Sequence, residues 1–462
     1  MNKNSPNILF LFTDDQRFDT IRALGNDQIH TPHFDHVVTN GTAFTQAAIM
    51  GGSSPAVCMP SRAMLLTGRT LFHIEGRGET IPTAHTTIPE HFRQLGYETF
   101  GTGKWHNGTE AYARSFSSGA EIFFGGMDDH WNVPACNYAE NGIYPDPRPH
   151  PIRWLPWELS ETEKRFDHLT LGKHSSELFA DAACNFLQKH PSNQPFFAYA
   201  SFMAPHDPRT MPPEYLAMYD PAALSLPPNF MAKHPFDNGA LDIRDEKLAA
   251  QPRQQDDIRR HLADYYAMIT HLDAQIGRIL DALRETGAFE NTIIVLAGDN
   301  GLALGQHGLM GKQNLYDHSV RVPLVLMGPG IPMGETRDSL CYLIDIFPTL
   351  CDLTGQPIPE SVEGKSLQPV FKDITHAHRD TLNFAYMDIH RSIMDSRYKL
   401  IEYAVDGIRT TQFFDRLEDP WELENLADDP AFSDPLEKLR HELLRWCVDN
   451  DDWEAVTKDY VL

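Results

Sequence analysis

Five short apolar runs, each ending abruptly in polar residues, constrain the fold of this chain more than any other feature. They comprise residues 8–12, 97–101, 196–200, 292–297 and 322–327. Near-continuous apolar runs of this length are typical of strands buried on both faces of a parallel sheet. Segments with apolar residues at helical spacing lie between or after the runs, at residues 89–95, 257–286 and 342–354. Strands that alternate with helices predict an α/β fold with helices on both faces of a parallel sheet.

Polar side chains follow the ends of these runs, where ligands bind in parallel α/β sheets. Asp14 and Asp15 follow the first run, and Asp299 and Asn300 follow the fourth. Two adjacent carboxylates repel each other unless a cation or a proton lies between them. Oxygen donors without a thiolate or histidine pattern suit Ca²⁺ or Mg²⁺. Turn formation would explain either pair taken alone, but two such pairs after buried strands favour a metal site.

The last part of the chain has a different pattern, which indicates a second unit. Short strand-like segments joined by turns occupy residues 382–386, 391–394, 398–403 and 411–415, and a helical pattern follows at residues 434–449. A chain of 462 residues fits one large domain and a smaller one. We therefore expect a catalytic domain over residues 1–378 and an α+β subdomain over residues 379–462.

Two long segments interrupt the alternation, at residues 128–160 and 205–256. The first contains Trp131, Trp154 and Trp157 among many prolines, and the second is rich in proline and charge. Long insertions of this kind often shape the mouth of a binding site.

Composition excludes several classes of function. A net charge of −25 argues against a nucleic-acid partner. No apolar stretch is long enough to span a membrane, so we expect no membrane partner. The first apolar run is too short for a signal peptide and no cleavage site follows it, so we expect a cytoplasmic protein. The alternative is a periplasmic or secreted protein from which the signal has been trimmed. The six cysteines include no Cys-x-x-Cys pair, which disfavours a zinc site built on thiolates.

Cys58 lies at the predicted start of a helix. Pro60 suits the first helical turn, and Gly68 can end the helix. Cys58 would then lie at the positive end of the helix, where an anion is stabilised. Arg62 is four residues further on, so its side chain can reach the same terminus. A structural cysteine at a helix cap is the alternative interpretation of this segment taken alone.

This segment resembles the signature of the type I sulfatases, which depend on formylglycine and belong to the alkaline phosphatase superfamily. Their pattern Cys-x-Pro-Ser-Arg, followed by Leu-Thr-Gly-Arg, matches residues 58–62 and 66–69. Three further family motifs occur in the family's order: Gly-Lys-x-His at residues 103–106, Pro-His-x-Pro at 205–208, and the segment carrying a second sulfate-binding lysine at 305–323. The combination is far more specific than any one motif.

The resemblance implies a large, mixed, mostly parallel sheet sandwiched by helices, as in alkaline phosphatase. It also implies a smaller C-terminal α+β subdomain that holds an antiparallel sheet. Cys58 would be oxidised to formylglycine by a formylglycine-generating or anaerobic sulfatase-maturing enzyme, and the hydrated aldehyde would be the nucleophile. The implied metal is Ca²⁺, or Mg²⁺ in its place, and its implied ligands are Asp14, Asp15, Cys58, Asp299 and Asn300.

The resemblance also assigns the other catalytic roles. Lys104 and Lys312 would neutralise the sulfate oxygens, and Arg62 would favour the ionised nucleophile. His206, helped by Lys312, would protonate the leaving oxygen, and His106 would take a proton from the second hydroxyl. A histidine or lysine considered alone is more often a packed or solvated residue than a catalytic one.

We expect the substrate to be a small sulfated saccharide, for example a 2-O-sulfated uronic acid. From their positions in loops, His130, His307 and Arg391 are further candidates for substrate contact. One alternative is a phosphonate monoester or phosphodiester hydrolase of the same superfamily. Another is a non-catalytic binder of sulfated glycans in which Cys58 stays unmodified.

Overall fold

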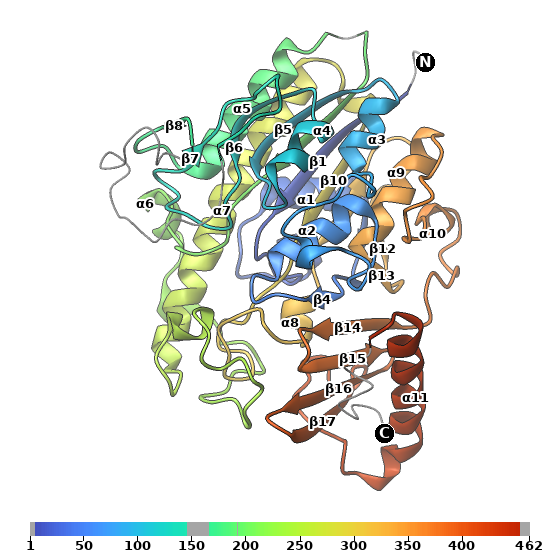
Figure 1. Cartoon of the computed structure of the whole chain (residues 1–462). Helices are drawn as coiled ribbons and strands as arrows, with labels where there is room; N and C mark the ends of the chain where they lie inside the picture. The colour runs from blue at the N-terminus through green and yellow to red at the C-terminus, as the bar shows by residue number, and fades with distance from the viewer. Residues whose placement is uncertain (1–4, 146–165, 192, 453–462) are drawn as a thin grey trace.

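An eight-stranded sheet forms the centre of the computed structural model, which describes residues 5–145, 166–191 and 193–452 (Figure 1). Its strand order is β12-β2-β11-β10-β1-β9-β5-β6. The strands are β1 (Asn7–Thr13), β2 (Thr42–Phe44), β5 (Glu98–Lys104), β6 (Ser118–Phe123), β9 (Phe196–Ser201), β10 (Thr292–Gly298), β11 (Leu324–Met327) and β12 (Glu335–Arg337). Five of the seven neighbouring pairs are parallel: β1/β10, β1/β9, β5/β9, β5/β6 and β12/β2. The predicted mixed, mostly parallel sheet is confirmed.

Strand β11 is the exception to the parallel arrangement expected of the five apolar runs. It lies antiparallel to both β10 and β2. Parallel neighbours need a long crossover that returns the chain to the opposite edge of the sheet. The connection between β10 and β11 contains only the one-turn helix α8 (Asp317–Val320) and no such crossover. The chain therefore enters β11 from the edge at which it left β10, and the prediction of a parallel strand was wrong here.

Strand β1 shows why the apolar runs are nearly continuous. Ile8, Phe10 and Phe12 pack into one hydrophobic cluster, while Leu9 and Leu11 pack into a second cluster on the other face. Successive strand side chains point to opposite faces, so a strand covered on both sides must be apolar at every position. Figure 1 shows α5 and α7 on one side of the sheet and α2, α3 and α9 on the other. These helices are α2 (Cys58–Thr67), α3 (Ile88–Gln94), α5 (Ser175–Lys189), α7 (Gln255–Glu285) and α9 (Ile346–Thr354).

The C-terminal sheet has the strand order β17-β16-β15-β14-β4, and all its pairs except β14/β4 are antiparallel. Its strands are β4 (Gly51–Gly52), β14 (Leu382–Tyr386), β15 (His390–Met394), β16 (Tyr398–Val405) and β17 (Ile408–Asp415). Asp406 and Gly407 both have positive φ, as a tight hairpin turn requires. Helix α11 (Ser433–Asp449) packs on this sheet through Leu436, Leu439 and Leu443. The predicted antiparallel subdomain is confirmed, while the boundary at residues 378 and 379 stays a prediction.

The described chain also contains shorter α-helices and strands. The helices are α1 (Pro32–Thr39), α4 (Thr109–Ser115), α6 (Pro213–Leu216) and α10 (Gln368–Lys372), and the strands are β3 (Ala47–Ala48), β7 (Pro134–Ala135), β8 (His168–Leu169) and β13 (Cys341–Tyr342). All six cysteines are free. Of the helices in the described ranges, none is both long and apolar enough to cross a lipid bilayer. Trp154 and Trp157 of the first insertion lie outside the described residues.

Candidate active site

The carboxyl ends of the parallel strands β1, β5, β9 and β10 meet at one edge of the large sheet. Backbone hydrogen bonds join the segments that follow three of them: the Asp299 amide donates to the Thr13 carbonyl at 3.0 Å, and the Asp14 amide donates to the Ala204 carbonyl at 3.1 Å. The beginning of α2 lies at the same edge, because the Ser61 hydroxyl donates to the Asp299 carbonyl at 2.5 Å. The candidate residues brought together here are Asp14, Asp15, Cys58, Arg62, Lys104, His106, His206, Asp299, Asn300 and Lys312.

Arg62 joins two of the buried carboxylates. Its Nε donates to Asp299 Oδ2 at 2.9 Å, and its terminal nitrogen donates to Asp14 Oδ2 at 3.3 Å. Its other terminal nitrogen donates to the Ser201 hydroxyl at 2.7 Å. All three charged side chains are fully buried. Arg62 therefore offsets negative charge that would otherwise be costly to bury.

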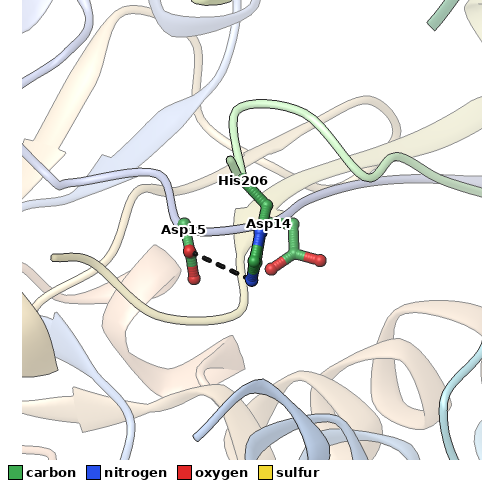
Figure 2. Close-up of side chains that lie close together, drawn as sticks. All are labelled: Asp14, Asp15 and His206. Carbon is green, nitrogen blue, oxygen red and sulfur yellow. Dashed lines mark ion pairs between the residues drawn. The ribbon is translucent and has the colours of Figure 1, made fainter. Parts of the chain in front are cut away.

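Asp15 belongs to the same group of buried carboxylates, Asp14, Asp15 and Asp299, which we call the acidic cluster. Its Oδ1 accepts hydrogen bonds of 2.6 Å from both Asn300 Nδ2 and Lys312 Nζ. His206 Nε2 lies 3.6 Å from Asp15 Oδ2, and Figure 2 shows this ion pair beside Asp14. The φ angle of Asp15 is +59°, a conformation that non-glycine residues adopt rarely and mainly where the surrounding structure imposes it.

The donor atoms of this cluster fit a hard cation. Asp14 Oδ1 and Asn300 Oδ1 are buried oxygens that find no hydrogen-bond partner among the described residues. Ligand atoms of Asp14, Cys58 and Asp299 lie within 4.8 Å of one another, as do those of Asp14, Asp15 and His206. Carboxylate and amide oxygens are the ligands that Ca²⁺ and Mg²⁺ prefer. The cluster is therefore an acidic site that could hold a metal ion.

The protein environment drives the pKa values of two of these carboxyl groups apart. Burial and the neighbouring Asp14 raise the pKa of Asp299 to about 7. Burial would raise the pKa of Asp14 too, but Lys104 and Arg62 outweigh it and hold that pKa well below the usual range. Such opposed shifts are typical of functional sites.

Cys58 is the first residue of α2 and is only 2% exposed. Its Sγ lies 3.5 Å from both Lys104 Nζ and His106 Nδ1. Burial raises the pKa of the Cys58 thiol despite the nearby lysines. An unmodified thiol is therefore not activated as a thiolate here. Burial and the positive charges of Lys104 and Arg62 hold the pKa of His106 well below its usual value, so its imidazole is neutral.

Close packing of strands explains the glycine of the Gly-Lys-x-His motif. Gly103 has a φ of +84°, and an added Cβ would lie 1.8 Å from the carbonyl oxygen of Ser201 on β9. Only glycine allows this approach. It is followed by Lys104, whose Nζ bonds Asp14 Oδ2.

His206 is held in one orientation by its own loop. Its Nδ1 lies 2.7 Å from the Asp207 carbonyl oxygen, and because a carbonyl only accepts, Nδ1 must donate. Nε2 is therefore the atom directed toward Asp15. The adjacent Asp207 carboxylate is bonded by Arg244, which lies further along the same insertion, and this contact helps to fix the loop.

The structure places the three further candidates in internal contacts. His130 bonds the Ser175 hydroxyl through Nδ1 at 2.7 Å and the His206 carbonyl through Nε2 at 3.1 Å, so it supports the loop of His206. His307 stacks on Tyr316 with ring centroids 3.8 Å apart. Arg391 bonds both carboxylate oxygens of Asp452, at 2.5 and 2.8 Å. Their contact with substrate stays a prediction.

Several residues near the site gave no sequence signal. Ser201 closes a strand without any motif, and Tyr265 is one of many apolar positions of α7. Arg209, Arg244 and Asp245 lie in the second insertion, which lacks a regular pattern. Only their proximity to Pro-His-x-Pro or their charge could have suggested them.

Buried neutral histidines predict a loss of stability on acidification. Burial lowers the pKa values of His174, His271, His307 and His390 to about 3, against about 6.5 in an unfolded chain. Below about pH 6.5 the unfolded chain binds more protons, so this stability is present above that pH and is lost as the pH falls toward 3. We expect urea unfolding to give a smaller free energy at about pH 5 than at about pH 7.5. An equal or larger value at pH 5 would refute this assignment.

Two family models match this chain. The sulfatase family model matches residues 6–356, and the model for the C-terminal part of N-sulphoglucosamine sulphohydrolase matches residues 305–449. An arylsulfatase from Clostridium perfringens is 28% identical, with 95% of this chain and 94% of the relative aligned. An N-acetylglucosamine-6-O-sulfatase from Bacteroides thetaiotaomicron is 26% identical, with 98% and 88% aligned.

Solved structures share the fold. A protein in complex with its substrate D-glucosamine-2-N,6-O-disulfate has a TM-score of 0.72 and 23% identity, covering 97% of this chain and 98% of that one. A phosphonate monoester hydrolase from Agrobacterium radiobacter has a TM-score of 0.74 and 22% identity, covering 96% of each chain. Because the sulfatase model matches most of the sequence, this chain belongs to the sulfatase family of sulfuric ester hydrolases.

Proposed function

We propose that this protein hydrolyses a sulfate ester of a saccharide through a formylglycine formed from Cys58. The position of Cys58 carries the proposal. Its side chain lies 3.5 Å from a lysine ammonium and 3.5 Å from a histidine ring nitrogen, beside the acidic cluster. A buried thiol with a raised pKa is a poor nucleophile in this place, whereas a hydrated aldehyde offers two hydroxyl groups on one carbon.

In the first half of the reaction, one hydroxyl of the hydrated aldehyde, ionised near the positive charge of Arg62 after its proton has passed to water, bonds to sulfur through its oxygen. The bond from sulfur to the alcohol oxygen of the substrate breaks, and His206 gives that oxygen a proton through Nε2. The hydrogen bond from Nδ1 to the Asp207 carbonyl keeps this ring oriented. Lys104 and Lys312 supply positive charge to the sulfate oxygens.

In the second half, the sulfate leaves the enzyme. Neutral His106 takes the proton of the second hydroxyl, the bond from carbon to the sulfate oxygen breaks, and the aldehyde returns. Addition of water restores the hydrate. A serine at position 58 would lack the second hydroxyl and could not release sulfate by this route.

A metal ion would be held by Asp14, Asp15, Asp299 and Asn300 together with the modified residue 58. When bound, it would supply Lewis-acid stabilisation of negative charge on the sulfate group. Ca²⁺ is the ion we propose, since the donors are carboxylate and amide oxygens. The buried Oδ1 atoms of Asp14 and Asn300, which have no hydrogen-bond partner among the residues that the structure describes, support this.

The saccharide substrate is supported by the relatives. One of them is an N-acetylglucosamine-6-O-sulfatase, and one similar structure holds D-glucosamine-2-N,6-O-disulfate as its substrate. A 2-O-sulfated uronic acid is a finer proposal of the same class. The test is sulfate release, measured by ion chromatography, from defined sulfated mono- and disaccharides. We expect release from at least one of them, and activity on aryl sulfate alone would contradict the saccharide assignment.

Phosphonate monoester hydrolysis is the second candidate, because an enzyme with that activity has the same fold over 96% of this chain. We expect kcat/KM for an aryl sulfate to exceed that for the matching aryl phosphonate monoester by at least about tenfold, equal to about 1.4 kcal/mol of transition-state stabilisation. Both rates can be followed through release of the same phenol. A preference for the phosphorus ester would replace the sulfatase proposal by this one.

A further inference from the structure

Two stacked histidine rings hydrogen-bond to the loop that carries His206. His130 lies in the first insertion, and His174 is the residue that caps the N-terminus of α5. Their ring centroids are 5.2 Å apart and their planes differ by 14°. Because both residues are closed to solvent, their effect on the site depends on the residues that they bond.

The two rings bond the two ends of the segment 206–210. His130 Nε2 lies 3.1 Å from the His206 carbonyl oxygen, and His174 Nε2 lies 2.8 Å from the Thr210 carbonyl oxygen. A carbonyl oxygen only accepts, so Nε2 is the donor in each ring. The loop is therefore held at its first and its last residue by side chains from outside it.

The second nitrogen of each ring is bonded as well. His130 Nδ1 lies 2.7 Å from the Ser175 hydroxyl oxygen, and His174 Nδ1 accepts from the Ser176 amide at 3.2 Å. Burial lowers the pKa of His130 to about 4 and that of His174 to about 3, so each neutral ring carries one proton. With that proton on Nε2, Nδ1 accepts, and one tautomer satisfies both nitrogens of each ring.

The bond from His130 reaches the ring of His206 through one peptide group. It fixes the carbonyl that joins His206 to Asp207. The next carbonyl along the chain, that of Asp207, is the one bonded by His206 Nδ1 at 2.7 Å. A rotation of the first peptide group would move this second carbonyl and turn the His206 ring with it. The direction of His206 Nε2, which lies 3.6 Å from Asp15, therefore depends on His130.

We propose that His130 and His174 are positioning residues, which clamp the loop 206–210 at both ends and so direct His206 Nε2 at the leaving oxygen. This inference rests on the proposed sulfatase function, in which His206 protonates the alcohol oxygen of the substrate. A general acid must lie within about 2.6–3.2 Å of the atom that it protonates. Loss of the clamp should therefore weaken proton transfer and leave the positive charge around the sulfate in place.

The basicity of the leaving oxygen distinguishes this positioning role from a merely structural one. 4-Nitrophenolate is a weak base that can leave without a proton, whereas phenolate is a stronger base that needs one more. For both sulfate esters, kcat/KM reports the first half of the reaction, up to release of the phenol. A misdirected general acid should slow phenyl sulfate more than 4-nitrophenyl sulfate, whereas general damage to the site should slow both equally.

Four variants and one matched control test this. His130→Leu and His174→Leu each remove one end of the clamp, while His130→Gln keeps an amide nitrogen where Nε2 was. Ser175→Ala is the mildest change, because it leaves His130 in place and removes only the hydroxyl bonded to it. The control is His91→Leu, because His91 is also a buried ring but lies in α3 and packs against Phe347 of α9.

In His130→Leu and His174→Leu, we expect kcat/KM to fall by about 10- to 100-fold for phenyl sulfate and by less than about threefold for 4-nitrophenyl sulfate. Ser175→Ala should show the same pattern with a smaller fall. His130→Gln should keep most of the phenyl sulfate rate, and His91→Leu should leave the ratio of the two rates at its wild-type value. An equal fall for both esters in the two clamp variants would overturn the inference.

Amide hydrogen exchange, followed by mass spectrometry, tests the clamp without any turnover. Exchange of residues 203–210 should be faster by about tenfold or more in His130→Leu and His174→Leu than in wild type, and unchanged in His91→Leu. Unchanged exchange in the two clamp variants would overturn the inference whatever their activity. Absence of turnover of every sulfate ester by aldehyde-bearing wild-type protein would instead refute the proposed function and the catalytic part of this inference, and exchange would still decide whether the clamp exists.

Discussion

Cys58→Ala is expected to lower kcat for sulfate ester hydrolysis by about 10³-fold or more, since it removes the atom from which the nucleophile is formed. The protein should keep its fold. Cys58 Sγ contacts Lys104 and His106 at 3.5 Å, and the remaining side chains of the site are held by Arg62 and by each other. Aryl sulfate turnover and thermal unfolding, measured on the same preparation, check both parts.

Two further variants sharpen this prediction. Cys184→Ala is the matched control, because Cys184 is a half-buried cysteine on α5 that contacts Arg278, and its activity should equal wild type. Cys58→Ser keeps one hydroxyl and lacks the second, so it should form at most one equivalent of covalent sulfate and then stop. Multiple turnovers by either Cys58 variant at a rate near wild type would refute the mechanism.

Removal of the proposed metal ion is the second change with a large expected effect. Exhaustive chelation should lower kcat by about 10²-fold or more, because charge on the sulfate group would lose its strongest stabilisation. Added Ca²⁺ should restore activity. Asp299→Asn should weaken metal retention as well, since it removes one of the carboxylates that would bind the metal. In the wild type, Arg62 holds this carboxylate at 2.9 Å.

The control for the metal variant is Asp181→Asn, which removes a carboxylate paired with Lys173 and Arg278 on the surface. It should retain both metal and activity. Metal content must be measured on the chelated sample, together with its rate. Full activity in protein shown to be free of divalent metal would contradict the assigned ligands.

The strands that form the site could be predicted because a strand buried on both faces must be apolar at every position. Ile8, Leu9, Phe10, Leu11 and Phe12, which pack alternately into two clusters, are such a run. The orientation of β11 could not be predicted in the same way. An apolar run indicates that a strand is buried. The direction of the strand in the sheet depends on the path of the connection that precedes it.

The site itself could be predicted only in part. Motifs gave the acidic residues and Cys58, but helical spacing could not show that Arg62 bonds Asp299, which lies 237 residues away. The partners of His130 likewise depend on tertiary packing, so its support of the His206 loop was not visible. Arg209 lies in an irregular insertion, and only the structure shows that its Nε meets no hydrogen-bond partner within the described part of the chain.

Mass spectrometry of the peptide that carries Cys58, from protein isolated from its native host, tests the central claim most directly. Conversion of the side chain to an aldehyde replaces sulfur by oxygen and removes two hydrogens, and the product can be captured with a hydrazide. We predict that this aldehyde is present and that sulfatase activity rises in proportion to it. A native protein that carries only the unmodified thiol would contradict the account and would favour a non-catalytic binder of sulfated glycans.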